Sequence, residues 1–365
     1  MSNAYRVISA DSHVNEPPGL YVDRVPSKYR DRVPHVEHRP EGYVWIVEGA
    51  SDPLNVSLTT QAGFPFDQLR AACHWDEVRK GGWDPAERLK LQDQDAVSAE
   101  ILYPTPRLSM GVARSNHEPE FHLVMMRAYN DWLSEFCSIA PQRLIGIAHM
   151  PTSGIDHVLA EFDRTCKLPG IGGVALLAFP NGGLDIAPED DRFWARCQEL
   201  DWPVNIHVGF AAHQVGALKS KLPGDVRFYD APTRIMQFMF SDVFVRFPRL
   251  KVGFIEVDIG WVPYLKEQLD DRYMRIHHIS RLTLPRKPSE YMDDNIFYTY
   301  INDPYGIANR HRVGIRNILW SSDFPHIGAD WPDSRKSIDR DFVGVPSAER
   351  DAIVAGNAMS LYHLK

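Results

Sequence analysis

Val7-Ile-Ser-Ala-Asp-Ser-His13 begins with apolar residues and ends in two side chains that can bind metal ions. The short apolar run predicts a buried strand. Because residues i and i+2 of a strand face the same side, Asp11 and His13 should point in one direction. A carboxylate and an imidazole on one face form half of a site for a divalent transition metal. Taken alone, the pair is also typical of a solvated corner or a capping pair, so its interpretation depends on the rest of the chain.

Short apolar runs of the same kind recur and alternate with segments of helical periodicity. Strands that alternate with helices predict right-handed parallel βαβ units, and eight of them predict a closed (β/α)8 TIM barrel. A doubly wound open sheet is the alternative, but no Gly-rich dinucleotide-binding turn follows the first strand. The seven later strands are expected at 99–105, 144–149, 173–178, 204–208, 251–256, 296–301 and 318–323. Helices are expected near 117–139, 155–166, 189–200, 232–247, 261–276 and 306–313.

A long segment, residues 17–83, separates the first strand from this regular alternation. It is rich in Pro, Arg, Trp and Gly and contains one candidate short strand, Tyr43–Val47. Long connections of this kind usually form lids, binding loops or insertions. We therefore expect residues 1–365 to form a single barrel domain, in which residues 17–83 are an insertion that covers the barrel mouth or packs against a second subunit. A helix should follow, with Asp84 as its N-cap and Pro85 in its first position.

Composition narrows the class of protein. A length of 365 residues suits one α/β barrel with insertions, and 44% hydrophobic and 24% charged residues are ordinary for a globular protein. A net charge of −8 without a basic block argues against nucleic acid as a partner. No run approaches the roughly 18 apolar residues of a membrane span, and the N-terminus lacks signal-peptide features, so a cytoplasmic protein is expected. Reduced, mostly buried thiols are expected at four scattered cysteines, Cys73, Cys137, Cys166 and Cys197.

Candidate functional residues lie where the predicted strands end. The active site of a (β/α)8 barrel lies at the C-terminal ends of its strands, so acids and imidazoles there should converge on one cavity. Each also has a structural interpretation: His207 as a core histidine, Asp323 as the cap of a turn, and Glu256 as a helix cap. His149 also ends a strand and belongs either to the pocket wall or to the core. The candidates are Asp11, His13, His207, Glu256, Asp258, Asp323 and His326.

Four motifs together resemble one family. The chain is similar to the amidohydrolase-related (amidohydrolase family 2) proteins of the amidohydrolase superfamily, which include the aminocarboxymuconate semialdehyde decarboxylase-like metal-dependent hydrolases. The resemblance implies a distorted barrel that holds one or two divalent metal ions, with His13, His207 and Asp323 as ligands, and a homodimer. The motifs are Asp11-Ser-His13-Val-Asn-Glu16-Pro, Phe247-Pro-Arg-Leu-Lys-Val252, Trp320-Ser-Ser-Asp323-Phe-Pro-His326 and Ala355-Gly-Asn-Ala358.

The sequence departs from the family pattern at two positions. Asp11 stands in place of the first His of the metal-binding pair. A ligand is kept, but it is a carboxylate oxygen, a harder donor than an imidazole nitrogen. Glu256 stands where many members have a His after the sixth strand. A Glu near a metal can act as a general base for water, or as an extra or bridging ligand that permits a second ion. Both roles suit hydrolysis at least as well as decarboxylation, so this substitution favours a hydrolase.

The hypothesis from sequence is therefore a metal-dependent hydrolase acting on a small amide, ester, lactone or thioester. A divalent ion, zinc by preference and manganese or iron as alternatives, would activate a water. Its ligands would be Asp11, His13, His207 and Asp323, with Glu256 as a possible further ligand.

Glu256 or Asp323 would take the proton from this water, and His326 would orient Asp323 or stabilise the oxyanion. The main alternative is a metal-dependent non-oxidative decarboxylase of an aromatic or enoic acid, and a less favoured one is an inactive ligand-binding barrel. Lys219, Lys221 and Arg227, in the loop from Phe210 to Tyr229, could meet a substrate carboxylate or simply be solvated.

Overall fold

The computed structural model describes residues 5–50, 53–56, 59–114, 118–209, 228–280 and 282–365. In these residues eight parallel strands form one sheet, and each strand pairs with the next strand of the barrel. Beyond the last strand, the Asp323 amide donates to the Asp11 carbonyl at 2.9 Å and the His13 amide donates to the Phe324 carbonyl at 2.7 Å. These bonds join the last strand to the first, so the sheet nearly closes, and the predicted (β/α)8 barrel is confirmed. The strands are β1 (Ile8–His13), β5 (Ala99–Tyr103), β6 (Leu144–His149), β7 (Ile171–Leu176), β8 (Val204–His207), β9 (Val252–Ile255), β10 (Ile296–Tyr300) and β11 (Ile318–Trp320).

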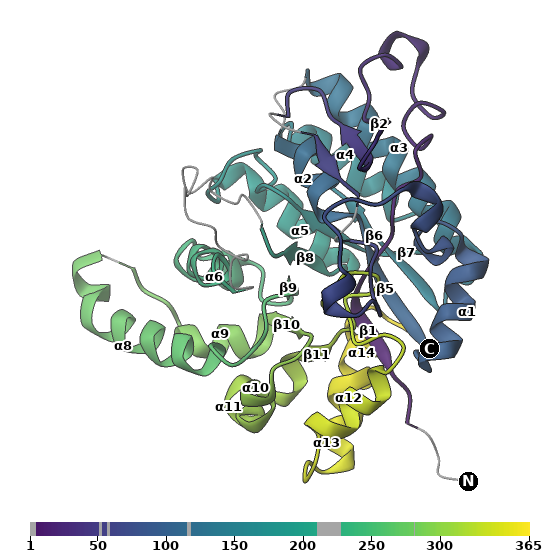
Figure 1. Ribbon diagram of the computed structural model, residues 1–365. Coiled ribbons are helices and arrows are strands. Elements are labelled where there is room, and N and C mark those ends of the chain that lie inside the picture. Colours follow the sequence, from purple (N-terminus) through teal and green to yellow (C-terminus); the bar gives the residue numbers. More distant parts are fainter. Residues whose placement is uncertain (1–4, 51–52, 57–58, 115–117, 210–227, 281) are drawn as a thin grey trace.

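Helices lie around the strands (Figure 1). Two predicted helices are each divided: the one expected at 232–247 breaks at Asp242, whose φ of 58° is left-handed, and the one expected at 306–313 forms two short helices. The helices are α1 (Pro85–Asp95), α2 (Pro106–Arg114), α3 (Pro119–Ser138), α4 (Ile155–Thr165), α5 (Asp191–Leu200), α6 (Ala231–Phe240), α7 (Val243–Arg246), α8 (Val262–Ser280), α9 (Pro288–Asn295), α10 (Pro304–Ala308), α11 (Arg310–Val313), α12 (Ser334–Asp341), α13 (Ser347–Asp351) and α14 (Asn357–Leu361).

Helix α1 begins where its sequence predicts. The Asp84 side chain accepts hydrogen bonds from the amides of Ala86 at 2.9 Å and Glu87 at 3.1 Å, and Pro85 fills the first position. These bonds satisfy amides that have no partner within the helix. The helix ends at Ala96, which has a left-handed φ of 56°. The cap therefore fixes the first turn of α1, which carries the fully buried Arg88.

The insertion contains a second, antiparallel sheet formed by β2 (His35–Arg39), β3 (Gly42–Ile46) and β4 (Leu54–Asn55). The sequence predicts only its middle strand, because β2 is mostly polar and exposed and β4 has two residues. The insertion meets the barrel at the C-terminal ends of strands. The Asn15 backbone amide donates to the Gly82 carbonyl at 2.8 Å, and the Ala62 backbone amide donates to the Pro325 carbonyl at 3.0 Å. Its function as a lid stays a prediction.

The opposite end of the barrel is filled by the C-terminal helices. Residues near the beginnings of strands, such as Ile8 and Ala99, form one buried cluster with Leu361 and Tyr362. The Tyr362 hydroxyl reaches into the barrel and donates to Asn205 Oδ1 at 2.8 Å. The barrel interior is therefore packed from below, and polar side chains can gather at the C-terminal ends of the strands.

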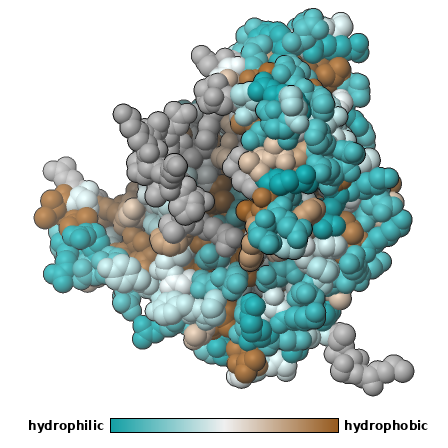
Figure 2. Space-filling model, in the orientation of Figure 1, coloured by the Kyte–Doolittle hydropathy of each residue, from teal (hydrophilic) through white to brown (hydrophobic). Residues whose placement is uncertain are grey.

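The molecular surface is predominantly hydrophilic in the view of Figure 2. An exception lies at the end of α8, where Met274 is 58% exposed and Ile279 is 83% exposed. All four cysteines are free. Within the described residues, no helix combines the length and the apolar character that crossing a bilayer requires.

The N-cap of α1 gives a test of this local structure. Asp84→Ala should lower the free energy of unfolding by about 1 kcal/mol, because two helix amides lose their acceptor. Asp84→Asn retains a capping oxygen and should change it by only a few tenths of a kcal/mol. Urea unfolding followed by circular dichroism measures the free energy of unfolding of both variants. Equal values for Asp84→Ala and Asp84→Asn would contradict the assigned cap.

Candidate metal centre

The strand ends bring the predicted acids and imidazoles together. One ligand atom each from Asp11, His13, His207 and Glu256 lies within 4.8 Å of the others, and the same holds for His13, Asp323 and His326. His13 belongs to both groups. We call these six residues the strand-end cluster. Asp11 and His13 come from β1 and His207 from β8. Glu256 directly follows β9, and Asp323 and His326 lie in the segment after β11.

Distances within the cluster are short. His13 Nε2 lies 3.4 Å from Asp11 Oδ1 and 3.3 Å from Asp323 Oδ1. His207 Nε2 lies 3.6 Å from both Asp11 Oδ1 and Glu256 Oε2. Carboxylate oxygens and imidazole nitrogens therefore face one another in two groups that share His13.

The hydrogen bonds of His13 and His207 indicate which ring atom of each imidazole faces the cluster. His13 Nδ1 donates to the Pro104 carbonyl at 2.8 Å, and His207 Nδ1 lies 3.3 Å from the Val208 carbonyl. These bonds favour the tautomer whose Nε2 carries a lone pair directed at the cluster. The Nε2 atoms of both rings and both Asp11 oxygens are buried and have no hydrogen-bond partner among the described residues. Because such atoms are rarely left unsatisfied, the donor set fits a divalent cation.

His326 contacts two other members of the cluster, His13 and Asp323. Its ring stacks on that of His13 with centroids 3.9 Å apart, and its Nδ1 lies 2.7 Å from Asp323 Oδ1. The contact can fix the orientation of the Asp323 carboxylate, as outer residues commonly do for metal ligands.

The charges of the cluster shift its pKa values in different directions. Burial alone would lower the pKa of His13, but the close carboxylates of Asp11 and Asp323 and their charges raise it well above its usual value. The pKa of Asp323 is lowered despite burial, chiefly by the charge of His326. Burial, reinforced by the charge of Asp323, raises the pKa of Glu256 to about 8. In the absence of a metal, Glu256 therefore carries a proton at neutral pH.

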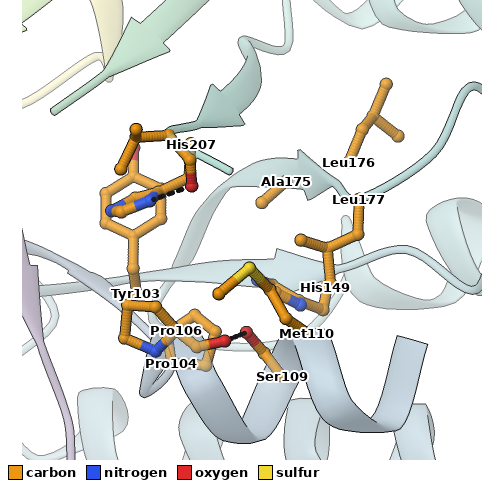
Figure 3. A pocket seen from close by; sticks show the side chains of 11 residues that line it. Tyr103, Pro104, Pro106, Ser109, Met110, His149, Ala175, Leu176, Leu177 and His207 are labelled. Atoms are coloured by element: carbon orange, nitrogen blue, oxygen red, sulfur yellow. Dashed lines mark hydrogen bonds between the residues drawn. The ribbon is translucent and has the colours of Figure 1, made fainter. Parts of the chain in front are cut away.

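An apolar pocket opens beside His207 (Figure 3). His149 lines this pocket, so of its two interpretations the pocket wall is the one the structure supports. Burial lowers the pKa of His149 to about 3, so this imidazole is neutral. The rest of the wall is formed by Tyr103, Pro104, Pro106, Ser109, Met110, Ala175, Leu176, Leu177 and Val208.

The other candidates from the sequence are Asp258 and three basic residues. Asp258 is in neither of the two ligand groups, and its Oδ1 accepts a hydrogen bond from the Ile301 amide at 3.4 Å. Lys219, Lys221 and Arg227 lie outside the described residues.

Two buried charged residues near the cluster, Glu16 and Arg88, are not predicted from the sequence to be functional. Glu16 accepts a hydrogen bond from the Thr105 amide at 3.0 Å, and burial raises its pKa to about 7. The position of Glu16 in the motif that begins at Asp11 is the sequence feature that could have identified it. Arg88 contacts the backbone of the cluster, and nothing in its helical sequence distinguishes it from a solvated residue.

Comparison with known proteins decides the family. Residues 11–364 match the amidohydrolase family model. The chain belongs to this amidohydrolase family. Over 341 residues it is 25% identical to γ-resorcylate decarboxylase of Rhizobium sp. (strain MTP-10005), covering 84% of this chain and 94% of that protein.

Two solved structures share the fold of this amidohydrolase. An amidohydrolase from Mycobacterium avium subsp. paratuberculosis K-10 has a TM-score of 0.76 at 20% identity, covering 100% of this chain and 99% of that one. A 5-carboxyvanillate decarboxylase from Novosphingobium aromaticivorans, solved with bound manganese, has a TM-score of 0.73 at 17% identity, covering 100% and 98%. The donor set of the strand-end cluster supports a divalent metal ion, and it does not single out zinc.

The comparison also corrects the predicted reaction. Hydrolysis of an amide, ester, lactone or thioester is wrong as the main interpretation, because the curated relatives that align over most of the chain are named decarboxylases. That prediction assumed that Glu256 is a ready base. Burial instead raises its pKa to about 8, so at neutral pH the metal-free protein presents an acid at this position.

Metal binding should depend on the two imidazoles that face the cluster. His13→Ala and His207→Ala should each abolish stoichiometric binding of Mn²⁺ while the far-UV circular dichroism stays that of the wild type. His311→Ala, at a side chain that is 61% exposed, is the control and should bind normally. Elemental analysis after dialysis reads out the result, and full occupancy in both cluster variants would refute the site.

Binding should also be coupled to protons. In the metal-free protein the pKa of His13 is raised well above its usual value, and a metal ion bound at Nε2 must displace that proton. Protons are therefore released on binding, and the affinity for Mn²⁺ should rise with pH across the neutral range. Calorimetry in buffers of different ionisation enthalpy counts these protons. An affinity independent of pH from 6 to 8 would show that no such proton is displaced.

Proposed function

We propose that this amidohydrolase is a metal-dependent non-oxidative decarboxylase, which removes CO2 from a small aromatic or enoic carboxylic acid. The observation that carries the proposal is the alignment of 84% of the chain with a γ-resorcylate decarboxylase. The strand-end cluster beside an apolar pocket supports it, because such a reaction needs a place for the acid group and a place for the conjugated carbon skeleton.

In this proposal Asp11, His13, His207 and Asp323 hold the divalent ion, with Glu256 beside them. When bound, the ion supplies a Lewis acid that offsets the negative charge of the substrate's carboxylate and adjacent oxygen. His326 keeps Asp323 in its orientation through the 2.7 Å contact between Nδ1 and Oδ1. Manganese is the first ion to test, and zinc and iron are the alternatives.

The apolar pocket wall is suited to an unsaturated carbon skeleton. Proline rings, Met110 and Leu177 surround the space with apolar surface, which favours a conjugated ring or chain over a strongly polar one. The neutral imidazole of His149 offers a hydrogen bond without adding charge. The insertion 17–83, which meets the C-terminal ends of β1 and β11, would cover the bound substrate.

In this proposal Glu256 delivers the proton that decarboxylation requires. The bond between the substrate carbon and its carboxylate breaks, and the electron pair stays on that carbon. Glu256 donates its proton to the same carbon, CO2 leaves, and solvent then reprotonates the carboxylate. In the metal-free protein burial raises the pKa of Glu256 to about 8, which suits a general acid.

The test is a panel of hydroxybenzoic and enoic acids incubated with the Mn²⁺-loaded and the metal-free protein in D2O. We expect CO2 release that requires the metal, with one deuterium entering the vacated carbon of the product. Activated esters and lactones in ¹⁸O-labelled water provide the parallel arm and should remain unlabelled. Absence of CO2 release from every acid, together with ¹⁸O in an acyl product, would overturn the proposal.

The same assay tests the acid. Glu256→Gln cannot donate a proton of comparable acidity, so kcat should fall by a factor of ~10² to 10⁴. Glu267→Gln is the matched control, because its side chain is 65% exposed on α8. If Glu256→Gln retains wild-type kcat with metal bound, another group supplies the proton.

A further inference from the structure

Arg88 is a fully buried cation next to the backbone of the strand-end cluster. Its guanidinium pairs with the buried Glu100 through Nε at 2.6 Å and Nη2 at 2.9 Å. Gln92 also donates to Glu100 Oε2, at 2.6 Å. Both oxygens of Glu100 therefore accept hydrogen bonds, and the remaining donors of Arg88 are directed elsewhere.

Those donors reach the chain segments that carry two of the proposed metal ligands. Nη1 donates to the carbonyl of His13 at 2.8 Å, and Nη2 donates to the carbonyl of Phe324, next to Asp323, at 3.3 Å. The Phe324 carbonyl also accepts from the His13 amide at 2.7 Å. A single side chain from α1 thus bridges the ends of the first and last strands of the barrel.

The bridge lies where the backbone needs support. Asp323 has a left-handed φ of 57°, which a residue with a side chain rarely adopts unless its surroundings hold it. The Arg88 guanidinium also lies 4.7 Å from the centre of the Phe324 ring, so it holds this residue through its carbonyl and its side chain.

We propose that Arg88 is a positioning residue that sets the geometry of His13 and Asp323 for the metal ion. The inference rests on the metal ligands assigned under the proposed function. A planar guanidinium can bind Glu100 with two parallel bonds and still direct hydrogens at two carbonyls, whereas an ammonium cannot match this fixed fork. The helix that follows the insertion therefore contributes to the metal centre without touching the metal.

Two variants separate positioning from stability. Arg88→Lys keeps the charge but loses the fork. The double variant Arg88→Met with Glu100→Gln removes both charges, so that no unpaired carboxylate is left buried. Both should retain wild-type far-UV circular dichroism, and both should bind Mn²⁺ more weakly by a factor of ~10 to 100, the usual effect of losing a residue that orients metal ligands.

Lys266 provides a matched control. It is 9% exposed and donates to two backbone carbonyls, of Arg312 and Val313, and to the Asp293 carboxylate. None of these groups belongs to the strand-end cluster. Lys266→Met should lower the melting temperature yet leave the affinity for Mn²⁺ unchanged.

The affinities are measured by calorimetric titration of metal-free protein with Mn²⁺, at a temperature where each variant is folded. Weaker binding by the Arg88 variants alone supports the inference. Wild-type affinity in folded Arg88 variants, or an equal loss in Lys266→Met, overturns it. Failure of the wild type itself to bind Mn²⁺ would instead refute the metal centre, and the role of Arg88 would fall with it.

Discussion

Two carboxylates, Asp11 and Asp323, are buried within 3.4 Å of one imidazole nitrogen of His13. Burying charges in this way is costly unless a partner compensates them, and both Asp11 oxygens lack a hydrogen-bond partner among the described residues. The need for a cation at this point explains the arrangement around it. The barrel closes through bonds between the segments that carry these acids, and the C-terminal helices fill the opposite end of the barrel.

Much of this architecture can be predicted from sequence because the barrel strands are short, mostly apolar runs, and several of them end at or shortly before a polar residue. That pattern located His207 and Asp323 as well as the strands themselves. It failed where structure depends on contacts distant in sequence. Strand β2 is polar and half exposed, so its pairing with β3 leaves little periodic signal. Arg88 belongs to a polar helical stretch and is recognisable only once the backbones of β1 and β11 are seen to surround it.

The reaction was harder to predict than the site. A metal held by acids and imidazoles can serve hydrolysis or decarboxylation, so the ligands alone do not decide between them. The sequence shows that Glu256 is a carboxylic acid, but its protonation depends on burial and on the neighbouring Asp323. The residue type of Glu256 predicts a base, but its buried environment favours the protonated form, which is an acid. Relatives named as decarboxylases favour the chemistry that uses such an acid.

We propose that the strand ends converge on one cation. Diffraction from crystals of the Mn²⁺-loaded protein on both sides of the manganese absorption edge tests this directly, because the difference locates manganese alone. We expect an anomalous peak within coordination distance of Asp11, His13, His207 and Asp323. A peak elsewhere, or none at this position in a protein shown to contain manganese, would contradict it.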